Sequence, residues 1–346
     1  MNERSRVKNA VRHQETDKIP WQIQLTSPAR AKVAEYYGER NLEDSASLNI
    51  WLGNHFRYVE PRSSGLFHGL EEEASPGQYR DGWGIVWDTR GIYGEGEWGR
   101  PTNRVLEGSS LSRFTFPSPP SSSAFAHYPQ FIEENRDYFL VAGEGHLFET
   151  AWALRGMERL LVDMHRNADF VDRLLDGITD YYLALVEESL KFDVDAFAFG
   201  DDWGYQEGIL MGPAMWRRFI KPRMAKMFAP IKRAGKITYL HSDGNITAIL
   251  EDLIEIGLDI YNPFQPEIMD LCKLKSTFGR RLCFHGGIGV QSILPFGSSQ
   301  EVRENVRQML GRIGKGGGYI LGPSHDVLAD APVENIVALI DEVRNQ

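Results

Sequence analysis

The stretch KITYLHSDGN, residues 236–245, decides the fold, because a short apolar strand ends there in a polar tip and a helix is predicted from Ile246. Four other segments repeat this order of strand, polar or glycine-rich tip and helix: DAFAFGDDWG at 195–204, LDIYNPFQP at 258–266, RLCFHGGIG at 281–289 and GGYILGPSHD at 317–326. Repeated βα units with polar residues at the carboxyl ends of strands are typical of a (β/α)8 TIM barrel. The active site is therefore expected at one mouth of a closed barrel.

The rest of the chain supplies further barrel elements. Strands are predicted from residue 19 and residue 138, which makes seven in all, and the eighth is expected somewhere in the irregular region 50–130. Residues 1–16 predict an N-terminal helical extension. The region 55–125 is rich in aromatic residues, glycine, serine and proline, and predicts inserted hairpins and a lid rather than a second domain. We expect one domain over residues 1–346.

Composition limits the classes of function. The formal net charge of −10 disfavours an electrostatic nucleic-acid binder, which needs clustered Lys and Arg. Two cysteines, Cys272 and Cys283, form no CxxC motif and favour a reducing, cytoplasmic setting. The charged N-terminus does not read as a signal peptide, and no apolar run reaches the roughly 18 residues of a membrane span. We expect a cytoplasmic enzyme that acts on a small molecule.

Asp201 and Asp202 follow the apolar strand AFAFG and are candidate catalytic residues. Two adjacent carboxylates can raise the pKa of one of them, which then suits acid–base catalysis. The alternative is that one of the two caps the next helix or accepts hydrogen bonds from loop amides.

His241, Asp243 and His325 also stand at strand tips and predict a site for zinc or another divalent ion. His241 and His325 are, in addition, candidate catalytic residues, since imidazole binds metals and transfers protons. The alternative for Asp243 is a helix cap. The spacing is long, and no compact HExxH or CxxC motif strengthens the prediction.

Three more residues and the tryptophans are candidates for substrate binding. His285 follows RLCF, although the glycines after it also suit a packed position. Asn262 and Gln265 can orient a substrate or hold their own turn. Trp83, with Trp51, Trp87 and Trp98, suggests a flat apolar surface, although tryptophans more often pack in a core. The dinucleotide, P-loop and serine-hydrolase motifs are absent from the sequence.

These strand tips resemble the uroporphyrinogen decarboxylase superfamily, which includes corrinoid-linked methyltransferases. The segments that carry the resemblance are DAFAFGDDWGYQEGILMGPAMWRRFIKPR, YLHSDGNI, DIYNPFQPE, FHGGIGVQSILPFGSSQEVRENV and GGYILGPSHDV. KIPWQI and YRDGWGIVW are similar to the methyltransferase-like branch. The resemblance implies the TIM-barrel fold and a homodimer.

The resemblance also favours one branch. Decarboxylases of the family carry an arginine-rich motif after the first strand, where this chain reads WQIQLTSPAR with Arg30 alone. One guanidinium is too few to hold a porphyrinogen with many carboxylates. The zinc-dependent methyltransferases carry His-x-Cys and a later Cys, whereas this chain has Asp243 and, near the second position, Ser324 or His325. A His/Asp/His metal set or no metal at all is then expected.

The leading hypothesis is an enzyme that moves a methyl group between a small methylated compound, such as a methoxylated aromatic or a methylamine, and the corrinoid of a partner protein. The alternative is a decarboxylase or other lyase, with Arg30 binding a small carboxylic acid and an Asp–His pair handling the proton. A third hypothesis is a binding protein that has lost catalysis.

Overall fold

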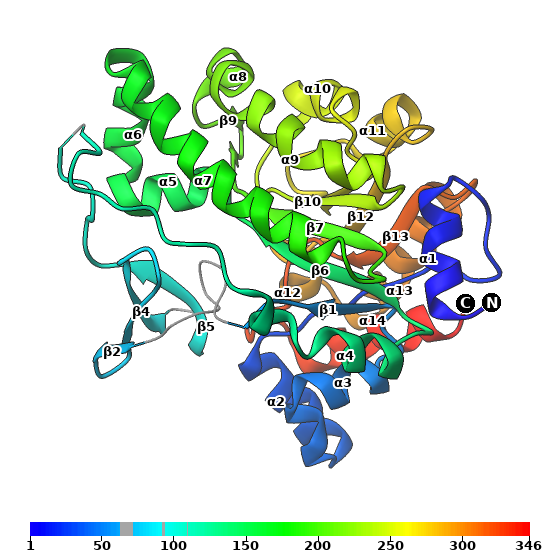
Figure 1. The fold of residues 1–346 in the computed structure, drawn as a ribbon. Helices are drawn as coiled ribbons and strands as arrows, with labels where there is room; N and C mark the ends of the chain where they lie inside the picture. Colours follow the sequence, from blue (N-terminus) through cyan, green and yellow to red (C-terminus); the bar gives the residue numbers. More distant parts are fainter. Residues whose placement is uncertain (63–71, 92–93, 109) are drawn as a thin grey trace.

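The computed structural model describes residues 1–62, 72–91, 94–108 and 110–346, and its centre is a curled sheet of seven parallel strands (Figure 1). The strand order is β1-β6-β7-β10-β11-β12-β13. Their bounds are Phe56–Val59 for β1, Phe139–Gly145 for β6, Ala196–Gly200 for β7, Ile237–His241 for β10, Ile260–Phe264 for β11, Cys283–Ile288 for β12 and Tyr319–Pro323 for β13.

This sheet confirms the predicted α/β class. Six of its strands are the predicted ones from residue 138 onward, and β1 lies in the region where the eighth was expected. The segment from residue 19 is not a regular strand. On one side it meets the sheet through two isolated parallel bridges, Trp21 with Leu321 and Leu25 with Val327. On its other side, the backbone oxygen of Trp21 accepts a hydrogen bond from the His55 amide. Full closure into an eight-stranded cylinder stays a prediction.

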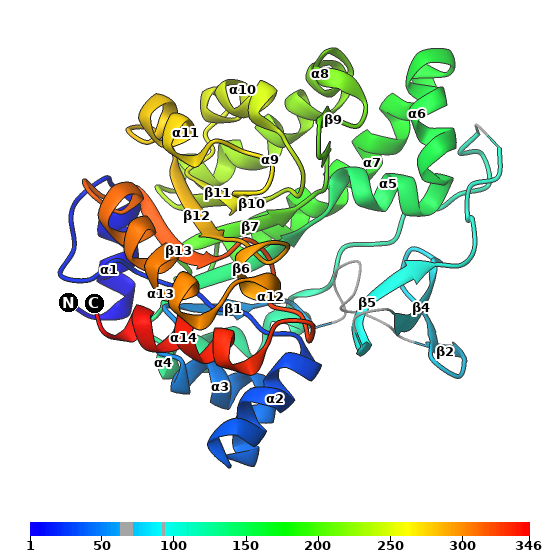
Figure 2. The ribbon, with the colours of Figure 1, turned by 180° about the vertical axis from the view of Figure 1, so that it is seen from behind.

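Helices cover the outer face of the sheet, and both chain ends lie together at one end of it, as Figures 1 and 2 show. The longer helices are α1 Glu3–Val11, α2 Ser27–Tyr37, α3 Ser45–Trp51, α4 Tyr128–Glu134, α5 Leu147–Arg155, α6 Met157–Arg166, α7 Ala168–Ser189, α9 Lys221–Arg233, α10 Leu250–Glu255, α11 Leu271–Phe278, α13 Ser299–Gln308 and α14 Val333–Arg344. The short helical turns are η1 Arg40–Glu43, η2 Ser122–Phe125, α8 Gly212–Met215, η3 Trp216–Ile220, η4 Thr247–Ile249, α12 Ile293–Phe296 and η5 Met309–Ile313. No helix among these residues is long and apolar enough to cross a membrane.

A small antiparallel sheet of four strands lies beside the main sheet, in the order β2-β3-β4-β5. Its strands are β2 Glu72–Ser75, β3 Gln78–Arg80, β4 Val86–Gly91 and β5 Gly94–Pro101, and a second hairpin pairs β8 Gly204–Tyr205 with β9 Gly208–Ile209. The four strands fall in the region where inserted hairpins were predicted. That this insertion acts as a lid within one domain stays a prediction.

The apolar core has two parts because both faces of the parallel sheet are covered. The larger part packs the sheet against the outer helices. The smaller part fills the inside of the curled sheet near the amino ends of the strands, where Phe56, Phe139 and Tyr239 meet Val7 of α1. Arg4 of α1 donates to the buried Asp195, which precedes β7, at 2.9 Å. Helix α1 therefore seals this end, and the polar strand tips gather at the other.

The role of α1 in closing this end of the sheet can be tested by mutation. Val7→Asp should lower the free energy of unfolding by roughly 3–5 kcal/mol, because it places an unpaired charge in the inner core. Val162→Asp makes the same chemical change at a side chain that is 45% exposed on α6, and should stay within about 0.5 kcal/mol of the unchanged chain. Urea unfolding followed by circular dichroism gives both values, and equal losses would contradict this role for α1.

Candidate active site

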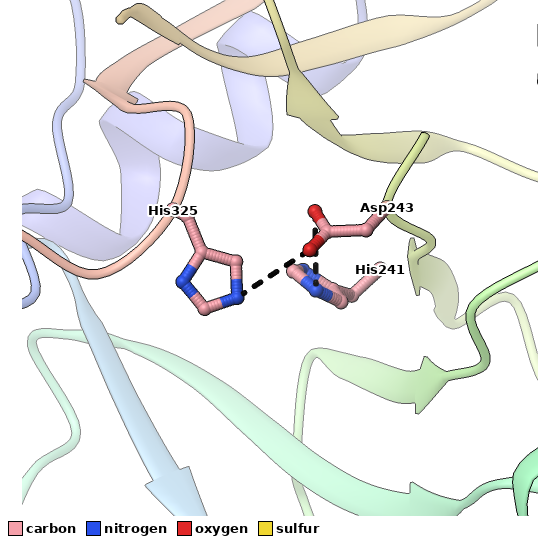
Figure 3. A group of neighbouring side chains, drawn as sticks. All are labelled: His241, Asp243 and His325. Carbon is pink, nitrogen blue, oxygen red and sulfur yellow. Dashed lines mark ion pairs between the residues drawn. The ribbon is translucent and has the colours of Figure 1, made fainter. Parts of the chain in front are cut away.

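His241, Asp243 and His325 meet at the carboxyl-end mouth of the sheet, and Figure 3 shows Asp243 reaching toward both imidazoles. Asp243 Oδ1 lies 3.9 Å from His241 Nε2, and its Oδ2 lies 3.7 Å from His325 Nε2. One ligand atom from each residue lies within 4.8 Å of the others. His241 ends β10, whereas His325 follows β13, so residues 84 positions apart come together because the parallel strands share one mouth.

Hydrogen bonds from backbone amides to the side chains of other loops hold the loop that carries Asp243. The Asp243 amide donates to Asp202 Oδ1 at 2.8 Å, and the Gly244 amide donates to Gln265 Oε1 at 3.0 Å. Gly204 lies so close to this loop that a Cβ on it would come within 2.6 Å of the Asp243 carbonyl oxygen. Asp202 and Gln265 therefore fix the position of Asp243, and Asp202 also brings negative charge to the mouth.

The orientation of His241 is set by Asn262. His241 Nδ1 donates to Asn262 Oδ1 at 2.6 Å, because an amide oxygen can only accept. The neutral ring therefore carries its lone pair on Nε2, the nitrogen that faces Asp243. Burial alone would lower the pKa of His241, but the carboxylates of Asp243 and Asp202 outweigh it and raise this pKa.

His285 lies beneath this pair and stays neutral. Its backbone oxygen accepts from Asn262 Nδ2 at 3.1 Å, and its ring nitrogen Nδ1 bonds the Tyr239 hydroxyl at 3.0 Å. Burial lowers the pKa of His285 to about 3. The ring is 3% exposed, yet it reaches the wall of the cavity. His285 thus supports Asn262 and contributes an uncharged wall.

His325 is held differently. Its Nδ1 accepts the Asp326 amide N–H at 2.8 Å, so the neutral ring carries its proton on Nε2, toward Asp243. Ser324, the alternative in this part of the sequence, is fully buried, and its Oγ accepts from the Val290 amide. His325 is therefore the residue that joins the cluster.

A small polar cavity opens beside the cluster. Amides and imidazoles line most of it, and no Lys or Arg does so among the described residues. The lining residues are Gln22, Gln24, His241, Asn262, His285, Pro323, His325 and Asp326. Of these, Gln22, Gln24, Pro323 and Asp326 were not predicted from the sequence. Gln22 and Gln24 lie within the strand predicted from residue 19, whereas the strand-tip pattern selects only residues at the ends of predicted strands.

Asp201 faces away from the cavity and holds the start of α5. Its two oxygens accept from the amides of Phe148 and Glu149 and from Trp203 Nε1, each at 2.8 Å. Burial and the nearby Glu149 raise the pKa of Asp201 to about 7. This geometry matches the alternative reading of the Asp201–Asp202 pair, in which one carboxylate accepts hydrogen bonds from backbone amides.

Arg30 and Trp83 lie outside the cavity lining. Arg30, on α2, donates to the backbone oxygen of Leu25 at 2.8 Å and to Ser27 Oγ. Trp83 is 4% exposed, and its ring packs on Tyr181 of α7 with centroids 4.9 Å apart. The Trp98 side chain lies outside the described residues. The structure thus assembles Asn262 and His285 at the cavity but gives Trp83 a packing position.

Sequence reasoning missed His146, which directly follows β6, and Glu149, which lies in the first turn of α5. His146 Nδ1 and Glu149 Oε2 are 2.6 Å apart, and their side chains are 30% and 17% exposed. Both residues follow a predicted strand, so the same strand-tip rule that selected His241 could have found them.

The cluster partly fits a divalent cation. Asp243 Oδ1 is buried and has no hydrogen-bond partner, and the lone pair of His241 Nε2 faces the same carboxylate. Two facing acceptors are unfavourable unless a proton or a cation lies between them. These two residues suit zinc or another divalent ion, whereas His325 would first have to lose the Nε2 proton or turn its ring.

Comparison with known proteins identifies the family. Residues 140–346, more than half of the chain, match the uroporphyrinogen decarboxylase (URO-D) family. The chain belongs to this family. The match begins at β6 and includes all the strand tips that build the cluster.

Curated relatives of this URO-D family member have two kinds of activity. One is a methylcobamide:CoM methyltransferase, MtaA, from Methanosarcina barkeri, 26% identical over 51% of this chain and 49% of the relative. Uroporphyrinogen decarboxylases from Coxiella burnetii, 22% identical over 58% of this chain and 53% of theirs, and from Thermus thermophilus, 26% identical over 49% and 48%, also match. The chain spans about half the length of these relatives.

A solved structure confirms the fold over the whole chain. A methyltransferase from Methanosarcina mazei superposes with a TM-score of 0.74 at 18% identity, covering 100% of this chain and 99% of that one. The likeness of fold to that structure therefore includes the N-terminal residues, beyond the part that the family match covers.

The role of Asn262 behind His241 can be tested through metal binding. Asn262→Ala should weaken Zn²⁺ binding about 10- to 100-fold, as is typical when the partner of a metal-ligating histidine is removed. Competition with a chromophoric chelator measures the affinity, and the exposed Asn41→Ala is the matched control. Equal affinities for the two variants would contradict a metal at His241 Nε2.

The neutral state of His285 predicts a pH dependence of stability. Its pKa falls from 6.5 to about 3 on folding, so between these values the unfolded chain binds a proton that the folded chain does not. The stabilisation by neutral His285 is therefore present above pH 6.5 and is lost at about 1.4 kcal/mol per pH unit as pH falls through this window. Urea unfolding between these pH values should show this slope reduced in His285→Gln and unchanged in the exposed His165→Gln.

Proposed function

We propose that this chain transfers a methyl group between a small methylated compound and the corrinoid of a separate protein. The observation that carries the proposal is the cavity wall of amides and imidazoles beside Asp243, without a cationic side chain among the described residues. A substrate rich in carboxylates would need bidentate arginine partners there. A methoxylated aromatic or a methylamine needs only hydrogen-bond partners and an acid for the leaving atom.

The relatives support methyl transfer as the activity, but they do not identify the substrate of this chain. MtaA is named a methylcobamide:CoM methyltransferase, and the superposed structure is named a methyltransferase. In this chain Asp243 and His325 stand where zinc-dependent members are expected to carry thiolates. The proposal therefore includes a site of oxygen and nitrogen ligands rather than sulfur.

Each residue of the cluster has a role in this proposal. His241 and Asp243 would hold a divalent cation, which polarises the heteroatom that bears the methyl group when bound. His325, whose neutral ring carries its proton on Nε2, would donate a hydrogen bond to the substrate. Asn262 keeps the His241 lone pair directed into the mouth, and Asp202 keeps Asp243 in place.

The direct test is methyl exchange. The chain is incubated with cob(I)alamin and a panel of O-methyl and N-methyl compounds, and separately with methylcobalamin and the demethylated compounds. The visible spectrum of the corrinoid should change for at least one member. Asp243→Asn should lower this rate about 100-fold or more, because it removes a charge at the reacting centre, whereas the exposed His165→Gln should not.

A separate incubation with small carboxylic acids distinguishes this function from the lyase alternative. Carbon dioxide release from small carboxylic acids without corrinoid, abolished by Arg30→Ala, would favour the lyase. The absence of methyl exchange in both directions would overturn the proposal.

A further inference from the structure

A second histidine–carboxylate pair lies at the same mouth and has no role in the proposed function so far. His146 is the residue between β6 and α5, and its side chain does not cap the helix. Its Nδ1 instead lies 2.6 Å from Glu149 Oε2, one helical turn further on. Neither side chain is fully buried, so a ligand in the mouth can reach them.

The His146 ring faces the inside of the sheet, as the His241 ring does. Gly200 at the end of β7 pairs in register with His241 of β10, and in-register neighbours of parallel strands point to the same side. A Cβ on Gly200 would lie 2.6 Å from His146 Cε1. The imidazole therefore occupies the space that a side chain at Gly200 would fill, next to His241 across one strand. The glycine is what admits the ring.

The pair is held rigidly. Asp201, at the tip of β7, accepts the Phe148 and Glu149 amides at the start of α5, each at 2.8 Å. These bonds tie the β6–α5 turn to the strand beside His241. A turn fixed in this way limits the positions that the His146 ring can take, as a catalytic side chain requires.

Carboxylates around His146 favour its protonated form. The groups that act on it are Glu149 on α5 and Asp201 and Asp202 after β7, and Tyr182 of α7 packs behind the turn. Burial alone would lower the pKa of His146, but these carboxylates raise it above the ordinary value for histidine. These carboxylates therefore favour the protonated ring, which is the form that can donate a proton.

We propose that His146 is the general acid that protonates the atom from which the methyl group departs, and that Glu149 positions it. This inference rests on the proposed methyl transfer. When the carbon–heteroatom bond breaks, its electron pair stays on the heteroatom and takes the proton from His146. The new bond to the methyl carbon uses an electron pair from the reduced corrinoid of the partner. His146 ends neutral and recovers a proton from water.

The test compares compounds that differ only in the basicity of the leaving atom. Substituted methoxybenzenes form one such series and substituted N-methylanilines the other, and the series that the unchanged chain accepts is used. General acid catalysis contributes about 10²- to 10⁴-fold, and most for strongly basic leaving groups. His146→Gln should therefore lose about 100-fold in kcat on the most basic leaving group and less than about 10-fold on the least basic.

Two further variants sharpen the result. Glu149→Gln keeps a hydrogen-bond acceptor but removes the negative charge, which lowers the pKa of His146. The pH profile of kcat in this variant should therefore shift to lower pH. The exposed His165→Gln is the matched control and should leave both the series and the pH profile unchanged. In the unchanged chain, kcat should fall at high pH as His146 loses its proton. His146→Gln should not show this fall.

The outcomes separate the two proposals. A steeper dependence on leaving-group basicity in His146→Gln supports the inference. If His146→Gln loses kcat equally over the whole series and keeps the fall in kcat at high pH, His146 only shapes the mouth. This outcome overturns the inference but leaves the proposed methyl transfer standing. No methyl exchange by the unchanged chain overturns the proposed function and this inference with it.

Discussion

The in-register parallel pairing of β7, β10 and β11 is the constraint on which the site depends. It sets Gly200, His241 and Asn262 side by side at one level of the sheet. Because parallel strands end at the same edge, each tip adds a side chain to one mouth. The glycine leaves room for His146, and the asparagine orients His241.

Hydrogen bonds between neighbouring tips turn this edge into a defined geometry. Asp201 and Asp202 are adjacent in sequence but serve opposite neighbours: Asp201 accepts amides of α5, and Asp202 accepts the Asp243 amide. Each carboxylate thereby fixes a loop that carries another candidate residue. Among the described side-chain atoms, Asp243 Oδ1 stands out because it is buried beside two imidazoles with no hydrogen-bond partner. A buried acceptor without a partner, at the mouth and beside two imidazoles, marks a place where a ligand can fit.

Sequence reasoning located most of the parallel strands and the residues at their tips. It could not place the eighth element, because β1 has only four residues and lies among hairpins of similar composition. It left open whether Asn262 and Gln265 orient a substrate or hold their own turn. In the structure Asn262 reaches the cavity, whereas Gln265 holds the Gly244 amide. It passed over His146, whose strand was recognised but whose tip was not considered.

The sequence by itself determined the α/β class, the succession of βα units and the group His241, Asp243 and His325, because strand periodicity and the polarity of strand tips are local properties. Only the tertiary structure decided which nitrogen of each imidazole faces Asp243, which aspartate of the pair holds which loop, and that Arg30 and Trp83 lie away from the cavity. These outcomes depend on contacts between residues far apart in the chain, and a side chain's local sequence does not specify the partner that it meets after folding.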